Sequence, residues 1–158
     1  MHLPYIVNVF GTDISFLPVV VGALDDKTEE YYGKVFADYF KDPETVFLIS
    51  SDFCHWGKKF RYMRYNEEDG EIWESIQKLD QDSMECIKTL VPENFREYLS
   101  KTGNTICGRH PILLMMEVVN QCKRNEYTAE FFDYDQSNRA NSKNDMSVSY
   151  GAGVVWTR

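Results

Sequence analysis

Two short apolar runs separated by one amphipathic segment constrain the fold most strongly. The runs are Phe16–Gly22 and Thr45–Ser50, and each has the composition of a strand that is buried on both faces. Between them, Asp25 and Asp26 are good helix N-caps, and apolar residues then recur at helical spacing until Lys41–Pro43. The apolar positions, which we expect to face the core, are Tyr32, Val35, Phe36, Tyr39 and Phe40. The order strand, helix, strand predicts a βαβ unit, and therefore an α/β fold with a mixed sheet flanked by helices.

Further along the chain, apolar spacing predicts three helical regions and two closing strands. The first region is marked by Ile72, Ile76, Leu79, Ile87 and Leu90. Pro92 opens the second region and Gly103 ends it, while the third continues from Pro111. The strands are Tyr127–Tyr134 and Met146–Trp156. One face of the last strand carries only small residues, namely Ser147, Ser149, Gly151 and Gly153. We therefore expect another element to pack closely against that face.

Charge and hydropathy exclude several classes of function. The chain has 17 Lys and Arg residues against 25 Asp and Glu residues, a formal net charge of −8, and no basic run offsets this charge locally. A nucleic acid is therefore not an expected partner. No segment approaches the roughly 18 consecutive apolar residues that a membrane helix needs, so we expect no membrane span. With 158 residues and no linker composition, the chain is expected to form a single domain over residues 1–158.

The four cysteines are expected to be reduced thiols. The N-terminus has neither the basic nor the apolar region of a signal peptide, which favours a cytoplasmic location, where disulfides are rare. Cys86 and Cys122 fall in the apolar stripes of predicted helices, so their expected role is packing in the core. Cys54 and Cys107 differ, because a histidine follows each of them within three residues.

The polar segment Ser50–Gly57 follows directly on the second apolar run. In α/β proteins ligands bind at the carboxyl ends of strands, so this position favours a functional site. Asp52 offers a hard oxygen and His55 a borderline nitrogen, which suits either metal ligation or acid–base catalysis. The structural alternative is that Ser51 and Asp52 cap the following turn, that Cys54 is buried and that His55 bonds to the backbone.

A second polar cluster, Thr105–Pro111, contains Cys107 and His110 in a Cys-x-x-His spacing, which would place both side chains on one side of a turn. A closed structural zinc site would need two more soft ligands, and the chain has no Cys-x-x-Cys pair. An open, partial metal site therefore fits better. The structural alternative makes Cys107 a small buried apolar residue and Arg109 a surface charge paired with an acid.

Several long motifs along the whole chain resemble the Memo family, the mediators of receptor-driven cell motility. The motifs occur in the family's order and are Met1–Tyr5, Pro18–Gly22, Ser50–Gly57, Arg61–Tyr62, Gly70–Ile72, Asn104–Pro111 and Ser147–Gly153. The resemblance implies a fold similar to the C-terminal half of Memo proteins and of class III extradiol dioxygenases, which contain non-haem iron. It also implies an intracellular signalling and redox protein.

By this resemblance Cys107 corresponds to the family's cysteine metal ligand, at a position where the dioxygenases carry a carboxylate. His55 corresponds to the pocket histidine that serves as acid and base, and Asp52 lines the same pocket. The implied cofactor is redox-active iron or copper, with Cys107, His55 and Asp52 as its ligands in this chain. Since a thiolate replaces a carboxylate, we expect metal-dependent redox activity in place of ring cleavage.

Members of the family are also associated with a phosphotyrosine-bearing receptor peptide. The resemblance places His55 and Cys107 at the border of the peptide groove, where Arg61 or Arg109 would meet the anion. Memo chains are about twice as long as this one, above the usual domain size, so we expect the chain to begin within the family's domain. Two histidines that complete the family's metal site belong to the N-terminal half, and we therefore expect weak metal binding and a separate N-terminal half as a candidate partner.

The leading hypothesis is thus a Memo-like intracellular protein that binds iron or copper and acts in cell-motility signalling. The second is a non-catalytic adaptor for a phosphopeptide or protein, which the aromatic loop Phe60–Tyr65 favours. An active extradiol dioxygenase ranks lower, because its carboxylate ligand is replaced by Cys107. The last alternative is a truncated product without independent function.

Overall fold

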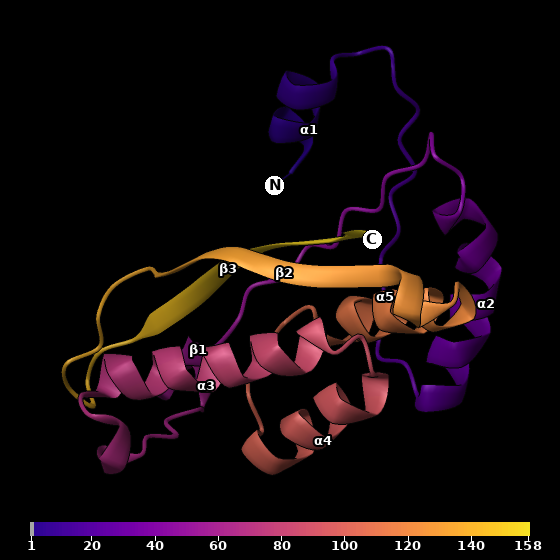
Figure 1. Ribbon diagram of the computed structural model, residues 1–158. Helices are drawn as coiled ribbons and strands as arrows, with labels where there is room; N and C mark the ends of the chain where they lie inside the picture. The colour runs from indigo at the N-terminus through magenta and orange to yellow at the C-terminus, as the bar shows by residue number, and fades with distance from the viewer. Residues whose placement is uncertain (1) are drawn as a thin grey trace.

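A computed structural model describes residues 2–158 and shows a small sheet with most of the helices on one of its faces (Figure 1). The elements in chain order are α1 (Leu3–Phe10), α2 (Asp26–Phe40), β1 (His55–Trp56), η1 (Lys58–Phe60), η2 (Glu67–Asp69), α3 (Ile72–Lys88), α4 (Pro92–Thr102), α5 (Arg109–Gln121), η3 (Arg124–Glu126), β2 (Tyr127–Gln136) and β3 (Ser147–Thr157). The predicted helices at α2, α3, α4 and α5 and the two closing strands are confirmed. α1, which no sequence pattern indicated, lies apart from the other helices.

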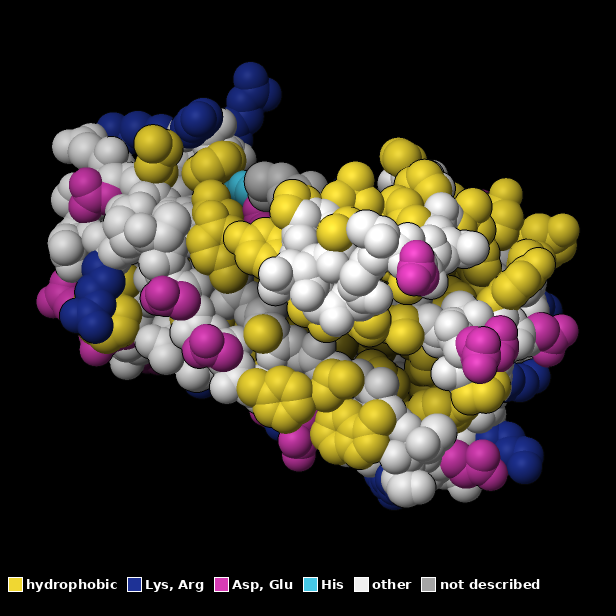
Figure 2. Space-filling view, turned by 90° about the horizontal axis from the view of Figure 1, so that it is seen from above, with side chains coloured by type: hydrophobic (Ala, Val, Ile, Leu, Met, Phe, Trp, Pro, Cys, Tyr) yellow, Lys and Arg dark blue, Asp and Glu magenta, His cyan; other side chains and the backbone are white. Residues whose placement is uncertain are grey.

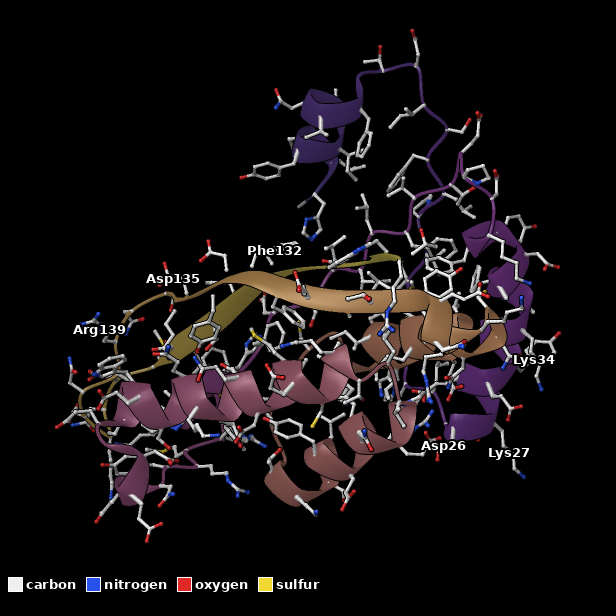
Figure 3. The ribbon with its side chains drawn as sticks, viewed as in Figure 1. Asp26, Lys27, Lys34, Phe132, Asp135 and Arg139 are labelled. Carbon is white, nitrogen blue, oxygen red and sulfur yellow. The ribbon has the colours of Figure 1, made fainter. Side chains whose placement is uncertain are left out.

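The sheet has the strand order β1-β3-β2. β2 and β3 form a long antiparallel pair in which Phe132 is an extra residue that bulges out of the ladder. Figure 3 shows Phe132 on the side of the sheet away from α3. β1 is short, and its two residues pair antiparallel with Val148 and Ser147 of β3. The α/β class is confirmed, while all strand pairs among residues 2–158 are antiparallel, so the parallel pair of the expected mixed sheet is not present there.

The predicted βαβ unit is wrong. Phe16–Gly22 and Thr45–Ser50 pair with no strand among residues 2–158. Most side chains of these segments are also exposed, with Leu17 at 80% and Val20 at 98%. A strand that is buried on both faces needs neighbouring strands for its backbone N–H and C=O groups as well as cover for its side chains, and neither segment has both here.

α2 forms where the pattern predicts it but buries a different face. Asp25 caps its first turn, as expected. Much of the predicted aromatic stripe faces outward, and Tyr32 is 41% exposed. The buried residues of α2 are Glu29, Gly33 and Ala37, and a Cβ atom at Gly33 would lie only 2.8 Å from the Cβ of Glu117 in α5. The absence of a side chain at Gly33 therefore lets α2 and α5 approach closely.

The predicted close packing against the last strand is confirmed. A Cβ atom at Gly151 would lie 2.6 Å from Met84 of α3 and 2.8 Å from the ring of Phe53. The core cluster lies on this side of the sheet and consists of Phe53, Met84, Ile87, Phe95, Tyr98, Ile106, Leu113 and Met116. Cys86 packs against this cluster and Cys122 is buried, as predicted. The large side chains of β3, including Tyr150 and Trp156, occupy the opposite face and remain partly exposed.

Candidate metal centre

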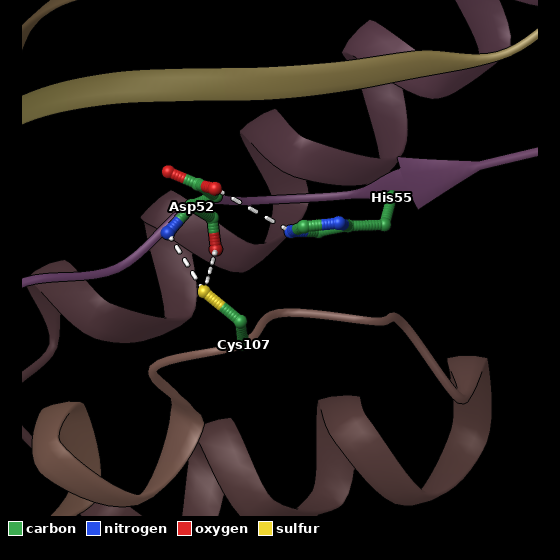
Figure 4. Close-up of side chains that lie close together, drawn as sticks. All are labelled: Asp52, His55 and Cys107. Carbon is green, nitrogen blue, oxygen red and sulfur yellow. Dashed lines mark hydrogen bonds and ion pairs between the residues drawn. The ribbon is translucent and has the colours of Figure 1, made fainter. Parts of the chain in front are cut away.

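Three sequence-predicted residues meet where the segment that leads into β1 approaches the loop before α5 (Figure 4). Asp52 and His55 come from the first segment and Cys107 from the second. One donor atom from each residue lies within 4.8 Å of the other two. The Asp52 Oδ2 atom is 3.6 Å from His55 Nε2, and the backbone N–H of Asp52 donates to Cys107 Sγ at 3.1 Å.

β3 holds the first of these segments in place. The backbone N–H of Phe53 donates to the carbonyl of Ser149 at 2.8 Å, and the N–H of Ser149 donates to the carbonyl of Cys54 at 3.0 Å. His55 then pairs with Val148. Residues alternate between the two sides of an extended chain, so burial of Cys54 in the core turns His55 toward the outside.

Two hydroxyl groups link the segment to the loop before α5. Thr105 Oγ1 accepts a hydrogen bond from the backbone N–H of His55 at 2.8 Å and donates one to its carbonyl at 2.9 Å. Ser51 Oγ accepts from the N–H of Gly108 at 3.0 Å and donates to the carbonyl of Asp52 at 2.9 Å. These bonds fix the backbone on both sides of the Asp52, His55 and Cys107 side chains.

Asp80 of α3 is a buried positioning residue that sequence reasoning missed. Its carboxylate accepts hydrogen bonds from the backbone N–H of Cys54 at 3.1 Å, from the amide of Asn104 at 3.1 Å and from the hydroxyl of Tyr134 at 3.0 Å. Burial raises the pKa of Asp80, although these hydrogen bonds act in the opposite direction. The signal was available, because a carboxylate four residues after Ile76 lies within an apolar helical stripe.

His55 and Cys107 border a cavity of about 310 Å³, whose other lining residues are Phe60, Thr105 and Arg109. The ring of Phe60 meets the imidazole of His55 edge to face, with 5.0 Å between the centroids. The Nε2 atom of His55 is buried and has no hydrogen-bond partner among residues 2–158. A buried nitrogen without a partner is costly, so this atom is suited to a ligand.

The remaining predicted site residues do not all join this cavity. His110 turns away, and its Nδ1 atom lies 3.1 Å from Glu29 of α2, so the Cys107–His110 pair does not form a joint site. Arg109 lines the cavity and contacts the carbonyl of Ile106 at 3.4 Å. Arg61 is exposed and lies outside the set of lining residues.

The structural alternatives are partly realised. Cys54 is buried, and the backbone of His55 is hydrogen-bonded, as those alternatives predict. Cys107, however, is exposed and not a core residue. No acidic partner of Arg109 is found in the described part of the chain, in contrast to the expected surface ion pair.

Fold and site together define a class of protein: an α/β domain in which an aspartate, a histidine and a cysteine from two segments meet beside an open cavity. A family model described as "Memo-like protein" matches residues 1–154. The chain belongs to the Memo family.

Curated relatives extend this result across vertebrates and nematodes. Protein MEMO1 of Xenopus laevis is 45% identical over 160 residues, covering 98% of this chain and 54% of the relative. The Mus musculus protein of the same name is 43% identical over an equal share of both chains, and the memo-1 homolog of Caenorhabditis elegans is 44% identical, covering 99% of this chain and 46% of the relative. The chain thus spans about half the length of these relatives, in agreement with the predicted match to the C-terminal half. Between residues 2 and 158, no helix combines the length and apolarity needed to cross a membrane.

Proposed function

We propose that Asp52, His55 and Cys107 bind a redox-active transition metal, either iron or copper. The observation that carries the proposal is the convergence of three donor atoms within 4.8 Å, one of which, the buried Nε2 atom of His55, makes no hydrogen bond among residues 2–158. The residues combine a hard oxygen, a borderline nitrogen and a soft sulfur, which suits copper(I) or iron(II) better than magnesium or calcium. When bound, the metal would supply one-electron redox chemistry.

The chain's own residues would contribute in distinct ways. Cys107 is exposed at the cavity and would bind through sulfur, while Asp52 and His55 would serve as further ligands or as a proton-transferring pair. Three protein ligands leave coordination positions open, as catalytic metal sites require. With only these three ligands, we expect metal affinity to be weaker than that of a site with four protein ligands.

Anaerobic titration with iron(II) and with copper(I) tests the metal site. We expect binding of at least one of these ions, and a loss of at least about tenfold in affinity in Cys107→Ala. Cys86→Ala is the matched control, because Cys86 lies on α3 and packs against the core cluster. Equal affinity of Cys107→Ala and the parent chain would refute the assignment.

Ring cleavage is not part of the proposal. The site carries the thiol of Cys107 where, by the family resemblance, dioxygenases have a carboxylate. We expect no ring-cleaved product when the chain is supplied with iron(II), oxygen and catechol. Turnover that disappears in His55→Ala would instead support a dioxygenase.

A second candidate function is binding of a phosphotyrosine peptide without chemistry. Arg109 favours it, because its guanidinium lines the cavity beside Cys107 and has no acidic partner in the described chain. Arg61, in the adjacent loop, would be a second contact for the anion. Fluorescence polarisation with a labelled phosphotyrosine peptide and its unphosphorylated twin tests this function. Binding by metal-free protein that survives His55→Ala but falls in Arg109→Met would favour the adaptor over the redox site.

From family membership we also propose a role in cell-motility signalling in the cytoplasm. Its test is rescue of cell migration in cells depleted of the endogenous protein. We expect the parent chain to restore migration and Cys107→Ala to fail if the metal site is needed. Rescue by both would separate the signalling role from the metal.

A further inference from the structure

A groove of about 450 Å³ lies between α3 and the outer edge of β2, and it shares no lining residue with the cavity at Cys107. Met84 of α3 and residues 131–134 of β2 line it, together with charged and polar side chains on the surface of α3. Met84 belongs to the core cluster and Phe131 packs against it, so these two residues give the groove an apolar base. The bulge in β2 turns Phe132 outward, and its side chain is 67% exposed. An apolar base beside an exposed aromatic ring is suited to hold side chains of a partner.

β2 forms one edge of the sheet, because the strand order is β1-β3-β2. It pairs with β3, and no strand in the described part of the chain pairs with its other side. Its ten residues, Tyr127–Gln136, give an edge that is long enough for an added strand. Extended peptides bind such edges through backbone hydrogen bonds, while pockets for alternate side chains provide specificity. Here α3 lies beside the edge and supplies the wall of the pocket.

The edge carries negative charge that the rest of the chain does not compensate. Glu130, Asp133 and Asp135 of β2 are all exposed, and the strand contains no Lys or Arg. None of these three acids forms an ion pair among residues 2–158. The two lysines of the groove wall, Lys78 and Lys88, are already paired within α3. The charge that remains free at the groove is therefore negative and attracts Lys or Arg side chains of a partner.

The acids lie close to the backbone of β2, on the face turned away from α3. The N–H of Tyr134 donates to Asp133 Oδ1 at 2.9 Å, and the N–H of Gln136 donates to Asp135 Oδ1 at 2.8 Å. The hydroxyl of Tyr134 bonds Asp80 of α3, so by strand alternation the neighbouring acids lie on the opposite face, where Figure 3 shows Asp135. In the view onto that face (Figure 2), acidic side chains lie among apolar ones along the lower edge. An added strand would point every second side chain into the groove and the others toward the acids.

We propose that the groove between α3 and β2 binds an extended peptide segment in which apolar and basic residues alternate, and that this segment adds as a strand to the free edge of β2. Its apolar side chains contact Met84 and Phe131, and its basic side chains face Glu130, Asp133 and Asp135. A second copy of this chain is a poorer occupant, because two β2 edges would place acids opposite acids. The proposal goes beyond the metal site and does not depend on it.

Fluorescence polarisation with synthetic peptides tests the proposal. The probe is a labelled peptide of about eight residues that alternates valine and lysine. One control has the same composition in two blocks, which removes the alternation, and another alternates valine and glutamate, which reverses the charge. We expect the probe to bind, and both control peptides to bind at least about tenfold more weakly. Cys107→Ala should bind the probe as the parent chain does, which separates this test from that of the metal site.

N-methylated versions of the probe test the addition of a strand. Successive N–H groups of a strand point to opposite edges, so methyl groups on the valines block one edge of the peptide and methyl groups on the lysines block the other. We expect one version to lose at least about tenfold in affinity and the other to bind nearly as well as the probe, because only one edge pairs with β2.

A variant without the three edge charges tests the acids. Glu130→Gln, Asp133→Asn and Asp135→Asn together remove the charges and keep side-chain oxygens that can accept the backbone hydrogen bonds of β2. We expect this triple variant to bind the probe at least about tenfold more weakly than the parent chain. Phe132→Ala should also weaken binding, and because its side chain is exposed the change should leave the chain folded.

The matched control removes three exposed acids of η2, which lie outside the groove. It combines Glu67→Gln, Glu68→Gln and Asp69→Asn. Both triple variants change the net charge equally, so unspecific attraction of a basic peptide to an acidic chain would fall equally in the two. We expect the control to bind the probe as the parent chain does.

Four results would overturn the proposal. The first is the absence of binding by the probe, and the second is equal affinity for the probe and the peptide with two blocks. The third is equal binding of the two N-methylated versions, which would exclude strand addition. The fourth is equal affinity of the two triple variants; dimerisation of the edge variant alone would then show that the acids of β2 only keep copies of the chain apart.

Discussion

The hydroxyl of Thr105 binds both backbone groups of His55: it accepts a hydrogen bond from the N–H at 2.8 Å and donates one to the carbonyl at 2.9 Å. Thr105 lies two residues before Cys107, so a single side chain sets the distance between the imidazole and the thiol. Because the two segments are 50 residues apart in sequence, this contact joins parts of the chain that only the fold brings together.

Thr105→Val should therefore loosen the site. The methyl that replaces the hydroxyl leaves two polar backbone groups of His55 without this partner, and we expect the free energy of unfolding to fall by about 1–3 kcal/mol. Affinity for iron(II) or copper(I) at the proposed site should fall as well, because Cys107 is no longer tied to His55. Thr128→Val on β2 is the control, since that hydroxyl bonds only the exposed Arg158 side chain. Urea unfolding and metal titration of both variants measure the effects, and an unchanged metal affinity in Thr105→Val would contradict the positioning role.

Gly108→Ala should push the loop before α5 away from the segment that leads into β1, through a steric clash alone. The backbone at Gly108 has an ordinary φ of −91°, but a Cβ atom there would meet the side chain of Ser51 and lie 2.8 Å from the carbonyl oxygen of Ser50. We expect the free energy of unfolding to fall by about 1–3 kcal/mol. The hydrogen bond from the backbone N–H of Asp52 to Cys107 Sγ should weaken as well. Gly22→Ala is the control, because a Cβ atom at Gly22 would have nothing within 4 Å. Thermal unfolding measures the stability of the two variants. Equal losses of stability in both would rule out the close contact at Gly108 as the cause.

Asp80 should give stability a specific pH dependence. Burial raises the pKa of Asp80 in the folded chain, so the folded state holds this proton more tightly than the unfolded state does. Its contribution to stability is therefore fully present below the unfolded pKa of about 4 and decreases as the pH rises through the folded pKa. Asp80→Asn cannot lose that proton, so the stability of the parent chain relative to the variant should decline over this range. Urea unfolding from about pH 4.5 upward measures the difference, and a gap that is constant or grows with pH would contradict the raised pKa.

Arg96→Met should weaken the junction of three helices. The guanidinium of Arg96 on α4 lies 2.7 Å from Glu29 of α2 and 2.8 Å from Glu117 of α5, and both carboxylates are buried. Removal of the cation leaves two buried acids close together, and we expect a loss of about 3–5 kcal/mol. Lys101→Met on the same helix removes an exposed ion pair with Glu97 and should cost less than about 1 kcal/mol. Similar losses in the two variants would show that the buried cluster adds no special stability.

Local patterns were sufficient to predict most helices. Asp25 marks the start of α2, and Pro92 and Gly103 bound α4, because caps and breakers act within one turn of the chain. The same patterns failed at Phe16–Gly22 and Thr45–Ser50. Strand composition describes what a segment would bury, whereas a strand also requires a partner that sequence periodicity does not identify.

The candidate site, too, could be predicted from the sequence only in part. Sequence identified Asp52, His55 and Cys107 as chemically capable residues but could not establish that they meet, since their contact depends on hydrogen bonds from Thr105 and Ser51 between distant segments. His110 shows the difference: its spacing from Cys107 suggested a shared turn, yet Glu29 of α2 lies 3.1 Å from its ring. The place of Asp80 in an apolar helical stripe was visible in the sequence, but its role was not, because that role depends on partners from Cys54, Asn104 and Tyr134.

The sequence by itself determined α2, α3, α4 and α5, the two closing strands, the family and the candidate site residues, because each of these depends on residue type and short spacing. Only the tertiary structure decided that Cys107 lies beside Asp52 and His55, that α2 turns its tyrosines outward, and that the large side chains of β3 remain partly exposed. Those outcomes depend on packing between distant segments, where backbone pairing and the space at Gly33, Gly108 and Gly151 select one arrangement.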